Sequence, residues 1–325
     1  MDLLSDVIVS MRTGRPGAGR VEWHEPWGYD FPTDPCTAGF LIVVRGSGWL
    51  RAEGQPPAEL AAGDVVFSPR GDAYAISSEP TTPLTTAVPA LEPAAMYESV
   101  TAGTPGGRTT VTLCGGYRID PARAHPMLSE LPATLHLRPQ PGRHPQLQGA
   151  VAALAAEIET PTIGTDALVP ALLDSLLLYL LRAWFDRVPE RQGATDWAAA
   201  LTDPAIRSAL DAMHREPAQH WTVPELATSA RLSRAAFSRR FAALTGRPPM
   251  AYLTWWRMTL AARLLSDTDA PLREVADQVG YSSEFAFATA FRRAHHLAPG
   301  RYRRQRLHNG AADAEARTRL KPSAR

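Results

Sequence analysis

An approximate repeat lies near the carboxyl end of this chain, with one copy at residues 226–241 and the other at 275–291. Small, turn-forming and aromatic residues occupy matching places in the two copies. The matched residues are Ala227, Ala230, Leu232, Phe237 and Phe241 in the first copy, and Ala276, Val279, Tyr281, Phe287 and Phe291 in the second. Because the second turn is one residue longer, the match is approximate. The repeat predicts one supersecondary unit built twice.

Each copy has the features of a helix-turn-helix motif. A small residue in the first helix lets two helices cross closely, and Gly280 is free to adopt a positive φ in the second turn. Ser233 and Ser283 are predicted N-caps of the helix that follows each turn. Residues 222–225, Thr-Val-Pro-Glu, predict a capping box with proline in the first helical turn.

The second helix of such a motif lies in the major groove of DNA. Because the paired phenylalanines face the core, the positions between them face outward. Arginine reads guanine with two hydrogen bonds, serine contacts several bases, and the ring of Phe285 is suited to a thymine methyl group. The candidate DNA-contacting residues are Arg234, Ala235, Ser238, Arg239, Glu284, Phe285, Ala288, Thr289 and Arg292.

A long helix over residues 251–265 is predicted to hold the two motifs at a fixed separation. Second helices in successive major grooves lie about 34 Å apart along one face of the DNA. Arg257 and Arg263 on the long helix are either solvated charges or phosphate contacts. The alternative is a helical bundle in which the repeat serves packing alone.

The charge distribution favours DNA binding at this end of the chain. Residues 204–306 hold 16 arginines and 8 acidic residues, a net charge of +8. Residues 1–203 hold 14 arginines and 23 acidic residues, a net charge of −9. A basic segment joined to an acidic one is typical of a nucleic-acid-binding module beside a separate globular domain.

Residues 1–140 have the pattern of a β domain. Short apolar runs, such as 40–44, 65–67 and 109–114, alternate with turn signals about every 8–12 residues, which is typical of a sandwich or barrel. Residues 77–108, rich in Pro, Thr and Gly, are predicted to form loops. The expected fold is therefore an α+β multidomain chain with an N-terminal β-barrel, a helical segment and a C-terminal all-α domain.

Residues 146–190 change to helical periodicity. They form either a helical cap on the β domain or a pair of dimerisation helices, which would make the chain a homodimer. The most apolar run, 172–185, is interrupted by Asp174 and Arg182, so no membrane span is expected. Residues 189–195 are a predicted linker, and 307–325 a predicted disordered tail.

Residues 204–304 resemble the DNA-binding domain of the AraC/XylS family of bacterial regulators. Matching residues include Leu232-Ser233, Arg240-Phe241, Val279-Gly280-Tyr281 and Phe291-Arg292-Arg293. The resemblance implies a cytoplasmic, nucleoid-associated protein that binds double-stranded promoter DNA and activates transcription with RNA polymerase as a partner. Family members commonly carry arginine where this chain has Thr289, so we expect the first motif to dominate specificity.

Residues 1–140 resemble the cupin-type sensor domain found on a subgroup of these regulators. The match includes Pro26-Trp27-Gly28, Gly63-Asp64 and Leu113-Cys114-Gly115. Family members often have histidine, a metal ligand, where Leu41 and Tyr74 stand here. The resemblance therefore implies neither a metal cofactor nor an enzymatic activity for this chain.

Several sensor residues admit two interpretations. Five aromatic residues either line a small-molecule pocket inside the barrel or fill its core: Trp23, Trp27, Phe40, Trp49 and Tyr74. The two cysteines, Cys36 and Cys114, would form a redox pair only with their Cα atoms within ~7 Å and one accessible thiol of low pKa. A metal site would need Cys114 beside His125, joined by His24 or His136; otherwise Cys114 is a small buried hydrophobic residue.

The sequence thus predicts a sequence-specific DNA-binding regulator, an activator by resemblance, whose N-terminal domain senses a small molecule or an oxidant. Two alternatives remain open. One is a cupin enzyme fused to a DNA-binding module, and the other is a constitutive DNA-binding dimer with no effector.

Overall fold

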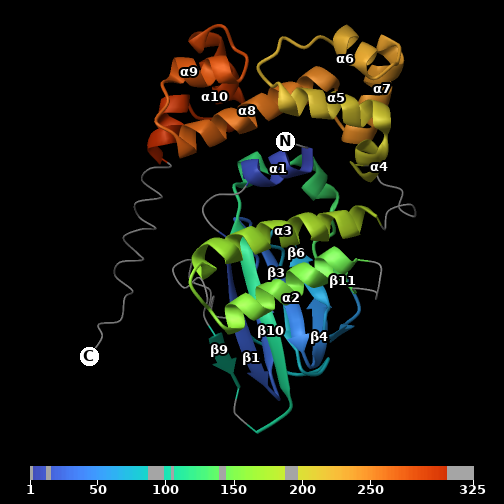
Figure 1. Cartoon of the computed structure of the whole chain (residues 1–325), viewed down its shortest axis with the longest axis vertical. Coiled ribbons are helices and arrows are strands. Elements are labelled where there is room, and N and C mark those ends of the chain that lie inside the picture. Colours follow the sequence, from blue (N-terminus) through green and yellow to red (C-terminus); the bar gives the residue numbers. More distant parts are fainter. Residues whose placement is uncertain are drawn as a thin grey trace. The chain divides into compact units, whose positions relative to one another are not determined.

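The computed structural model describes residues 3–11, 16–86, 99–103, 106–138, 144–186 and 197–305 (Figure 1). By their internal contacts, the residues divide into two compact units. One unit comprises Met1–Ser10 and Gln192–Arg325, and the other Met11–Arg191. The predicted linker at 189–195 and the predicted tail at 307–325 lie outside the described residues.

The unit of residues 11–191 is built on two β-sheets. A six-stranded sheet has the order β11-β6-β3-β10-β1-β9, and a five-stranded sheet the order β5-β4-β7-β2-β8. Neighbouring strands are antiparallel, except that β9 is parallel to β1 and β8 is parallel to β2. The strands are β1 (Gly17–His24), β2 (Gly28–Phe31), β3 (Thr37–Arg45), β4 (Ser47–Ala52), β5 (Ala58–Ala61), β6 (Val65–Ser68), β7 (Tyr74–Ser77), β8 (Thr85–Thr86), β9 (Ser99–Ala102), β10 (Thr109–Arg118) and β11 (Leu135–Leu137).

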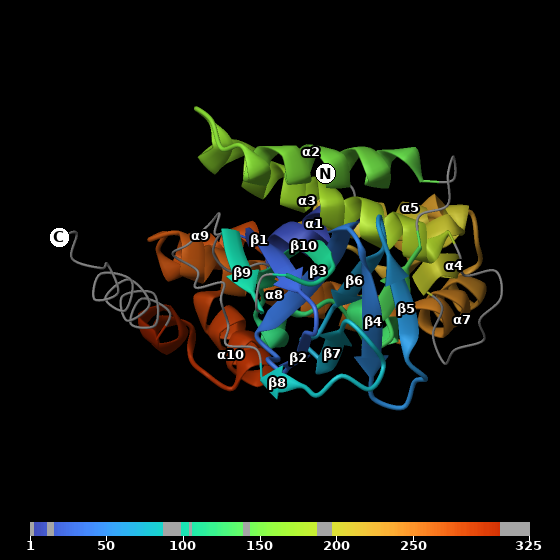
Figure 2. The same ribbon diagram turned by 90° about the horizontal axis from the view of Figure 1, so that it is seen from below.

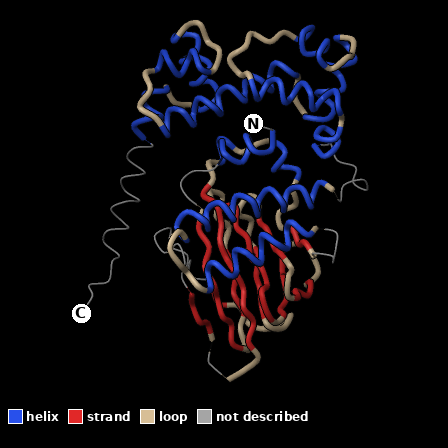
Figure 3. The backbone as a smooth tube through the Cα atoms, in the orientation of Figure 1, coloured by secondary structure: helices blue, strands red, loops and turns tan. Residues whose placement is uncertain are grey.

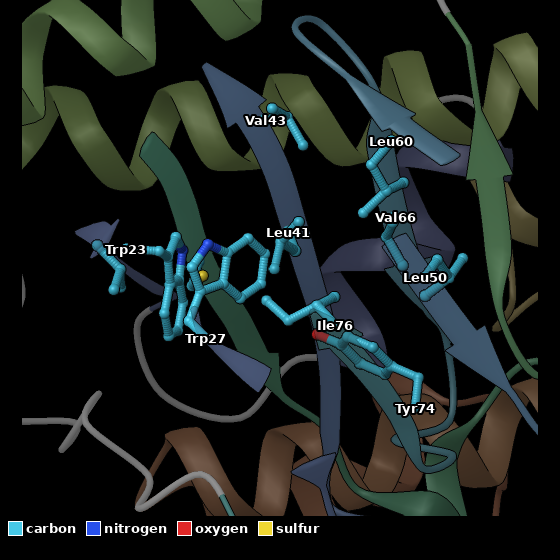
Figure 4. Close-up of a cluster of buried hydrophobic side chains, with 11 residues drawn as sticks. Trp23, Trp27, Leu41, Val43, Leu50, Leu60, Val66, Tyr74 and Ile76 are labelled. Atoms are coloured by element: carbon cyan, nitrogen blue, oxygen red, sulfur yellow. The ribbon is translucent and has the colours of Figure 1, made fainter. Parts of the chain in front are cut away.

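The two sheets share one apolar core, as expected for a sandwich or barrel. Alternate residues of β3, Leu41 and Val43, belong to the same cluster as Leu50 of β4 and Leu60 of β5 (Figure 4). Strands form at the three runs predicted at 40–44, 65–67 and 109–114. The prediction that 77–108 is all loop is wrong in two places, because β8 and β9 are short edge strands whose backbones pair with β2 and β1.

Two helices, α2 (Pro145–Glu159) and α3 (Thr165–Phe185), pack against each other and against β1. Figures 1 and 2 show them side by side over the six-stranded sheet. The hydroxyl of Tyr117 on β10 donates a hydrogen bond to the carbonyl of Leu173 on α3, which fixes the helix on the sheet. These contacts place α2 and α3 as a cap on the β domain, one of the two arrangements considered for residues 146–190.

Helix α3, which contains the apolar run 172–185, is long and apolar enough to cross a membrane when judged by length and composition only. Its three charged residues, Asp166, Asp174 and Arg182, leave the helix apolar on average. A helix in the core of a folded domain meets the same criterion, and one face of α3 is buried against α2 and the sheet.

The other unit consists of helices and loops in its described residues, in contrast to the strand-rich unit (Figure 3). Its longest helix, α8, extends two residues beyond the predicted 251–265 at each end. The helices are α1 (Leu3–Met11), α4 (Trp197–Thr202), α5 (Pro204–Arg215), α6 (Val223–Ser229), α7 (Arg234–Thr245), α8 (Pro249–Asp267), α9 (Leu272–Gln278) and α10 (Glu284–His295), followed by a helical segment at 299–305.

Helix α8 connects two subdomains of this unit. Tyr252 and Trp256 in its first half contact α5 and α7 through rings such as His214 and Phe241. Its second half lies in a cluster with α9 and α10. Figure 1 shows α6 and α7 near one end of α8, and α9 and α10 near the other. Nineteen residues of helix span about 28 Å at ~1.5 Å per residue.

Helix α1 begins the chain but belongs by its contacts to this helical unit. Its Leu3 and Ile8 side chains are buried, and the Asp6 carboxylate lies 3.6 Å from Nδ1 of His214 on α5. The chain therefore contributes to the helical unit from both of its ends.

Candidate DNA-binding interface

The two copies of the repeat fold with the same backbone hydrogen bonds. In the first turn the amide of Leu232 donates to the carbonyl of Ala227 at 2.9 Å, and in the second the amide of Tyr281 donates to the carbonyl of Ala276 at 2.9 Å. Both alanines are buried, so each pair of helices crosses over a small side chain. The sequence repeat is thus a structural repeat of two helix-turn-helix motifs.

Each turn contains one residue in the left-handed region. Gly280 has φ 78° in the second copy, as predicted, and Arg231 has φ 55° at the matching place in the first. An arginine in this conformation gives no signal in the sequence, because the left-handed region favours glycine.

The predicted caps are all present. Ser233 Oγ accepts from the amide of Ala236 at 3.3 Å, and Ser283 Oγ accepts from the amide of Ala286 at 3.4 Å. Thr222 and Glu225 form the complete capping box at the start of α6. The serine caps set the residue at which each second helix begins, and the capping box sets the start of the first motif.

The paired phenylalanines anchor each second helix from its inner side. Phe237 and Phe241 of α7 are fully buried, and so are Phe287 and Phe291 of α10. A helix held at positions four apart turns the intervening positions outward. The face that we predicted for base contact is therefore the exposed face of both helices.

On α7 the outward face carries two arginines that are available for a ligand. Arg234, Ala235 and Arg239 are exposed and Ser238 is half-buried. Neither Arg234 nor Arg239 forms an ion pair or side-chain hydrogen bond with any described residue. The next residue, Arg240, instead pairs with the Asp203 carboxylate, which also caps α5.

The outward face of α10 has a different chemistry. Glu284, Thr289 and Arg292 are exposed and Ala288 is half-buried. The Phe285 side chain is 84% exposed. This face therefore begins with a carboxylate and an aromatic ring, followed by small residues. Its first cation is Arg292.

The two arginines of the long helix have partners within the protein. Arg257 donates from Nε to the carbonyl of Pro217 and from a terminal nitrogen to that of Gln219, both at 2.7 Å. Arg263 pairs with Asp267 one turn later, at 3.5 Å. Arg257 is therefore not the solvated charge of one interpretation, because it is half-buried and bonded to two carbonyls; a phosphate contact stays a prediction.

In the β unit, three of the five predicted pocket residues lie inside the barrel. Trp23, Trp27 and Tyr74 belong to the interior cluster (Figure 4), and Trp23 stacks on Trp27 with ring centroids 5.3 Å apart. Phe40 and Trp49 were wrongly assigned to it. Strand alternation puts their neighbours Leu41 and Leu50 inside and turns these two rings to the other face.

The interior also contains polar groups. Nε1 of Trp23 donates to Thr112 at 2.8 Å, and the Thr112 hydroxyl lies 3.3 Å from the Cys114 sulfur. Nε1 of Trp27 is buried without a hydrogen-bond partner among the described residues. A buried donor without an acceptor is costly, so this indole is suited to receive an acceptor from a ligand.

The two cysteines do not form a redox pair. Cys114 lies on β10 opposite Leu41, whereas Thr37, the neighbour of Cys36, lies opposite Arg118. Four residues of strand separate these positions by about 13 Å, well beyond the range that a disulfide bridges. Burial also raises the pKa of the Cys114 thiol to about 11, which disfavours the reactive thiolate.

The candidate metal ligands are not brought together. Nδ1 of His125 accepts from the amide of Met127, and Nε2 of His136 lies 2.8 Å from the Asp64 carboxylate. Within the described ranges, no three His, Cys, Asp or Glu side chains are grouped to hold a metal ion. Leu41 and Tyr74, where the resemblance expects histidines, belong to the interior cluster.

Comparison with known proteins extends these observations. A family model described as cupin matches residues 2–186, and one described as a helix-turn-helix domain matches residues 226–305. A putative AraC-like transcription regulator of Streptomyces lividans is 31% identical over 94% of this chain and 98% of its own length. The RCS-specific HTH-type transcriptional activator RclR of Escherichia coli is 31% identical over 60% of this chain and 68% of its own.

Among solved structures, the DNA-binding domain of AdpA in complex with a target DNA is 33% identical. It covers 37% of this chain and 99% of its own, with a TM-score of 0.30.

Proposed function

Because the chain belongs to the AraC family of transcription regulators, with a cupin domain ahead of its helix-turn-helix domain, we propose that it reads promoter DNA through α7 and α10. In this proposal Arg234 and Arg239 hydrogen-bond to guanine edges in one major groove, and α10 enters the next. The supporting observation is the pair of exposed arginines on α7 that have no side-chain partner in the described ranges, next to Arg240, which has one.

The test is a comparison of adjacent arginines. A binding site is first selected from random duplexes with the full chain. Arg239→Ala should then weaken binding to that site by about 1–3 kcal/mol and leave binding to random DNA nearly unchanged. Arg240→Ala, which removes a pair within the protein, should not alter base preference. Equal loss on selected and random DNA in Arg239→Ala would contradict base recognition.

We infer that the effector is a small, largely apolar molecule with a hydrogen-bond acceptor, bound inside the barrel. The cluster around Trp23, Trp27 and Tyr74 supplies the aromatic surface, and Nε1 of Trp27 supplies an unused donor. The name of the relative RclR states a specificity for RCS. An oxidant effector is less well supported here, since the two cysteines are far apart and the Cys114 thiol is buried.

Thermal-shift screening of the full chain with a metabolite library tests the sensor. A true effector should raise the melting temperature, and Trp27→Phe, which removes only the indole N–H and part of the ring, should reduce that shift. If neither small molecules nor oxidants change stability or DNA binding, the constitutive dimer is the better description, with α2 and α3 as its dimerisation helices.

The output that we propose is activation of transcription with RNA polymerase in the cytoplasm. The relative RclR is named as an activator. An enzymatic role is disfavoured because Leu41 and Tyr74 offer no metal-ligating imidazole. In vitro transcription from a target promoter should rise when the protein is added, and a fall would identify a repressor.

A further inference from the structure

One aromatic ring projects from the second recognition helix. Phe285 lies in the first turn of α10 with 84% of its side chain exposed, and no other aromatic residue in the described part of the chain is exposed to this degree. An isolated exposed apolar residue is ordinary on a protein surface. What distinguishes Phe285 is its place on the helix face that we propose enters the major groove.

The internal repeat supplies a direct comparison. Phe287 of the second motif matches Phe237 of the first, so Phe285 matches Ala235. The ring therefore contributes nothing that the helix-turn-helix fold requires, because the first motif folds with alanine at that position. Its role must lie in what the second motif binds.

The surroundings of the ring restrict what it reads. Ala288 and Thr289, one turn further along the same face, are short and leave the ring as the most protruding group. No arginine stands on α10 before Arg292, so its first two turns cannot hold guanine in the bidentate manner expected of α7. In the major groove, the base feature that suits an apolar ring is the methyl group at C5 of a pyrimidine.

We propose that Phe285 recognises the C5 methyl group of a pyrimidine, so that the second motif reads its half-site by apolar contact and the first by hydrogen bonds to guanine. The inference rests on the proposed entry of α10 into the groove. Thymine carries this methyl group, and 5-methylcytosine presents it at the same position. Methylation of a cytosine at the contacted position therefore strengthens binding.

Base analogues that differ only in this methyl group provide the test. In the selected binding site, each thymine of the second half-site is replaced in turn by deoxyuridine. At one position the full chain should lose about fourfold in affinity, the effect of one apolar carbon left in water. At that position 5-methylcytosine should bind about fourfold more tightly than cytosine. Phe285→Ala should abolish both differences.

Three controls separate this role from others. Thr289→Ala lies on the same face and should keep the methyl discrimination. Phe285→Ala should also leave the salt dependence of binding unchanged, because an apolar contact releases no counterions. Since the ring is exposed, the melting temperature of Phe285→Ala should match that of the parent protein.

Three results would overturn the proposal. The first is equal binding of thymine and deoxyuridine sites at every position, and the second is methyl discrimination that persists in Phe285→Ala. The third is a Phe285→Ala variant with intact DNA binding and lower transcription, which would make the ring a contact for a protein partner. In each case a preserved effect of Arg239→Ala on the same site would leave the proposed DNA-binding function standing.

Discussion

At the scale of single residues, the left-handed position in each turn shows how two motifs of one fold tolerate different residues. A Cβ atom on Gly280 would lie 2.7 Å from the carbonyl oxygen of Ala218 and 2.9 Å from a nitrogen of Arg257. The second turn therefore needs glycine for both its φ and its space. Arg231 adopts the same region in the first turn, where its φ of 55° strains a residue that has a side chain.

Reciprocal substitutions at this position should have opposite effects on stability. Gly280→Ala should destabilise the helical unit by about 1–3 kcal/mol, because it adds strain and a close contact. Arg231→Gly should stabilise it by up to about 1 kcal/mol, because it relieves the left-handed strain. Thermal melts of the full chain followed by circular dichroism provide the measurement, and a stabilising Gly280→Ala would refute this account.

Arginines of the helical unit also differ in their partners at the residue scale. Arg240 and Arg257 hold the fold together through Asp203 and two backbone carbonyls, whereas Arg239 has no partner among the described residues. The count of 16 arginines in residues 204–306 therefore overstates the number of cations that are free to contact DNA. Arg257→Ala should therefore lower the stability of the helical unit more than it lowers the affinity for DNA.

At the scale of elements, the capping box fixes the start of the first motif. The amide of Glu225 donates to Thr222 Oγ1, and Glu225 Oε2 accepts from the Thr222 amide at 2.8 Å. Thr222→Ala should cost about 1 kcal/mol of stability in the helical unit. Thr228→Ala in the same helix removes a hydroxyl that bonds only back to Pro224, and should change stability little. Equal effects of the two variants in a melting experiment would argue against the cap.

The packing of α1, α5 and α8 around His214 predicts a dependence on pH. Burial lowers the pKa of His214, while Asp6 and Asp211 offset part of the shift. Nε2 of the ring lies 2.7 Å from the Tyr252 hydroxyl. The folded unit therefore holds a neutral imidazole, and protonation favours the unfolded chain.

The stability of the helical unit should thus fall as the pH drops below about 6.5, the ordinary pKa of histidine, towards the depressed value in the folded state. In His214→Gln, stability should depend less on pH over this range than in the parent protein. Melting temperatures measured from pH 7.5 downward provide the comparison, and an unchanged difference between the two proteins across that range would exclude His214 as the cause.

At the scale of the whole molecule, the two halves differ in charge sign, and DNA binding depends on the basic half. We expect Arg292, exposed and without a partner in the described residues, to contact a phosphate. Arg292→Ala should weaken binding to all DNA and reduce the slope of log affinity against log salt by about one. Arg263→Ala, whose side chain pairs with Asp267, should leave the slope unchanged. An unaltered slope in Arg292→Ala would remove it from the phosphate contacts.

The sequence alone determined the parts of this protein that depend on local chemistry. Caps at Thr222, Ser233 and Ser283, the turn glycine at 280 and the phenylalanines spaced four apart each act through a few neighbouring residues. Their pattern therefore predicted both motifs, and the resemblance named the family. Tertiary structure decided which side chains share a surface, because pairing between distant strands and helices has no local signal. It placed Leu41 and Leu50 inside the barrel in place of Phe40 and Trp49, and it separated Cys36 from Cys114. It also bound Arg257 to the loop at 217–219. Finally, it packed α1, from the amino end of the chain, into the helical unit that the carboxyl end forms.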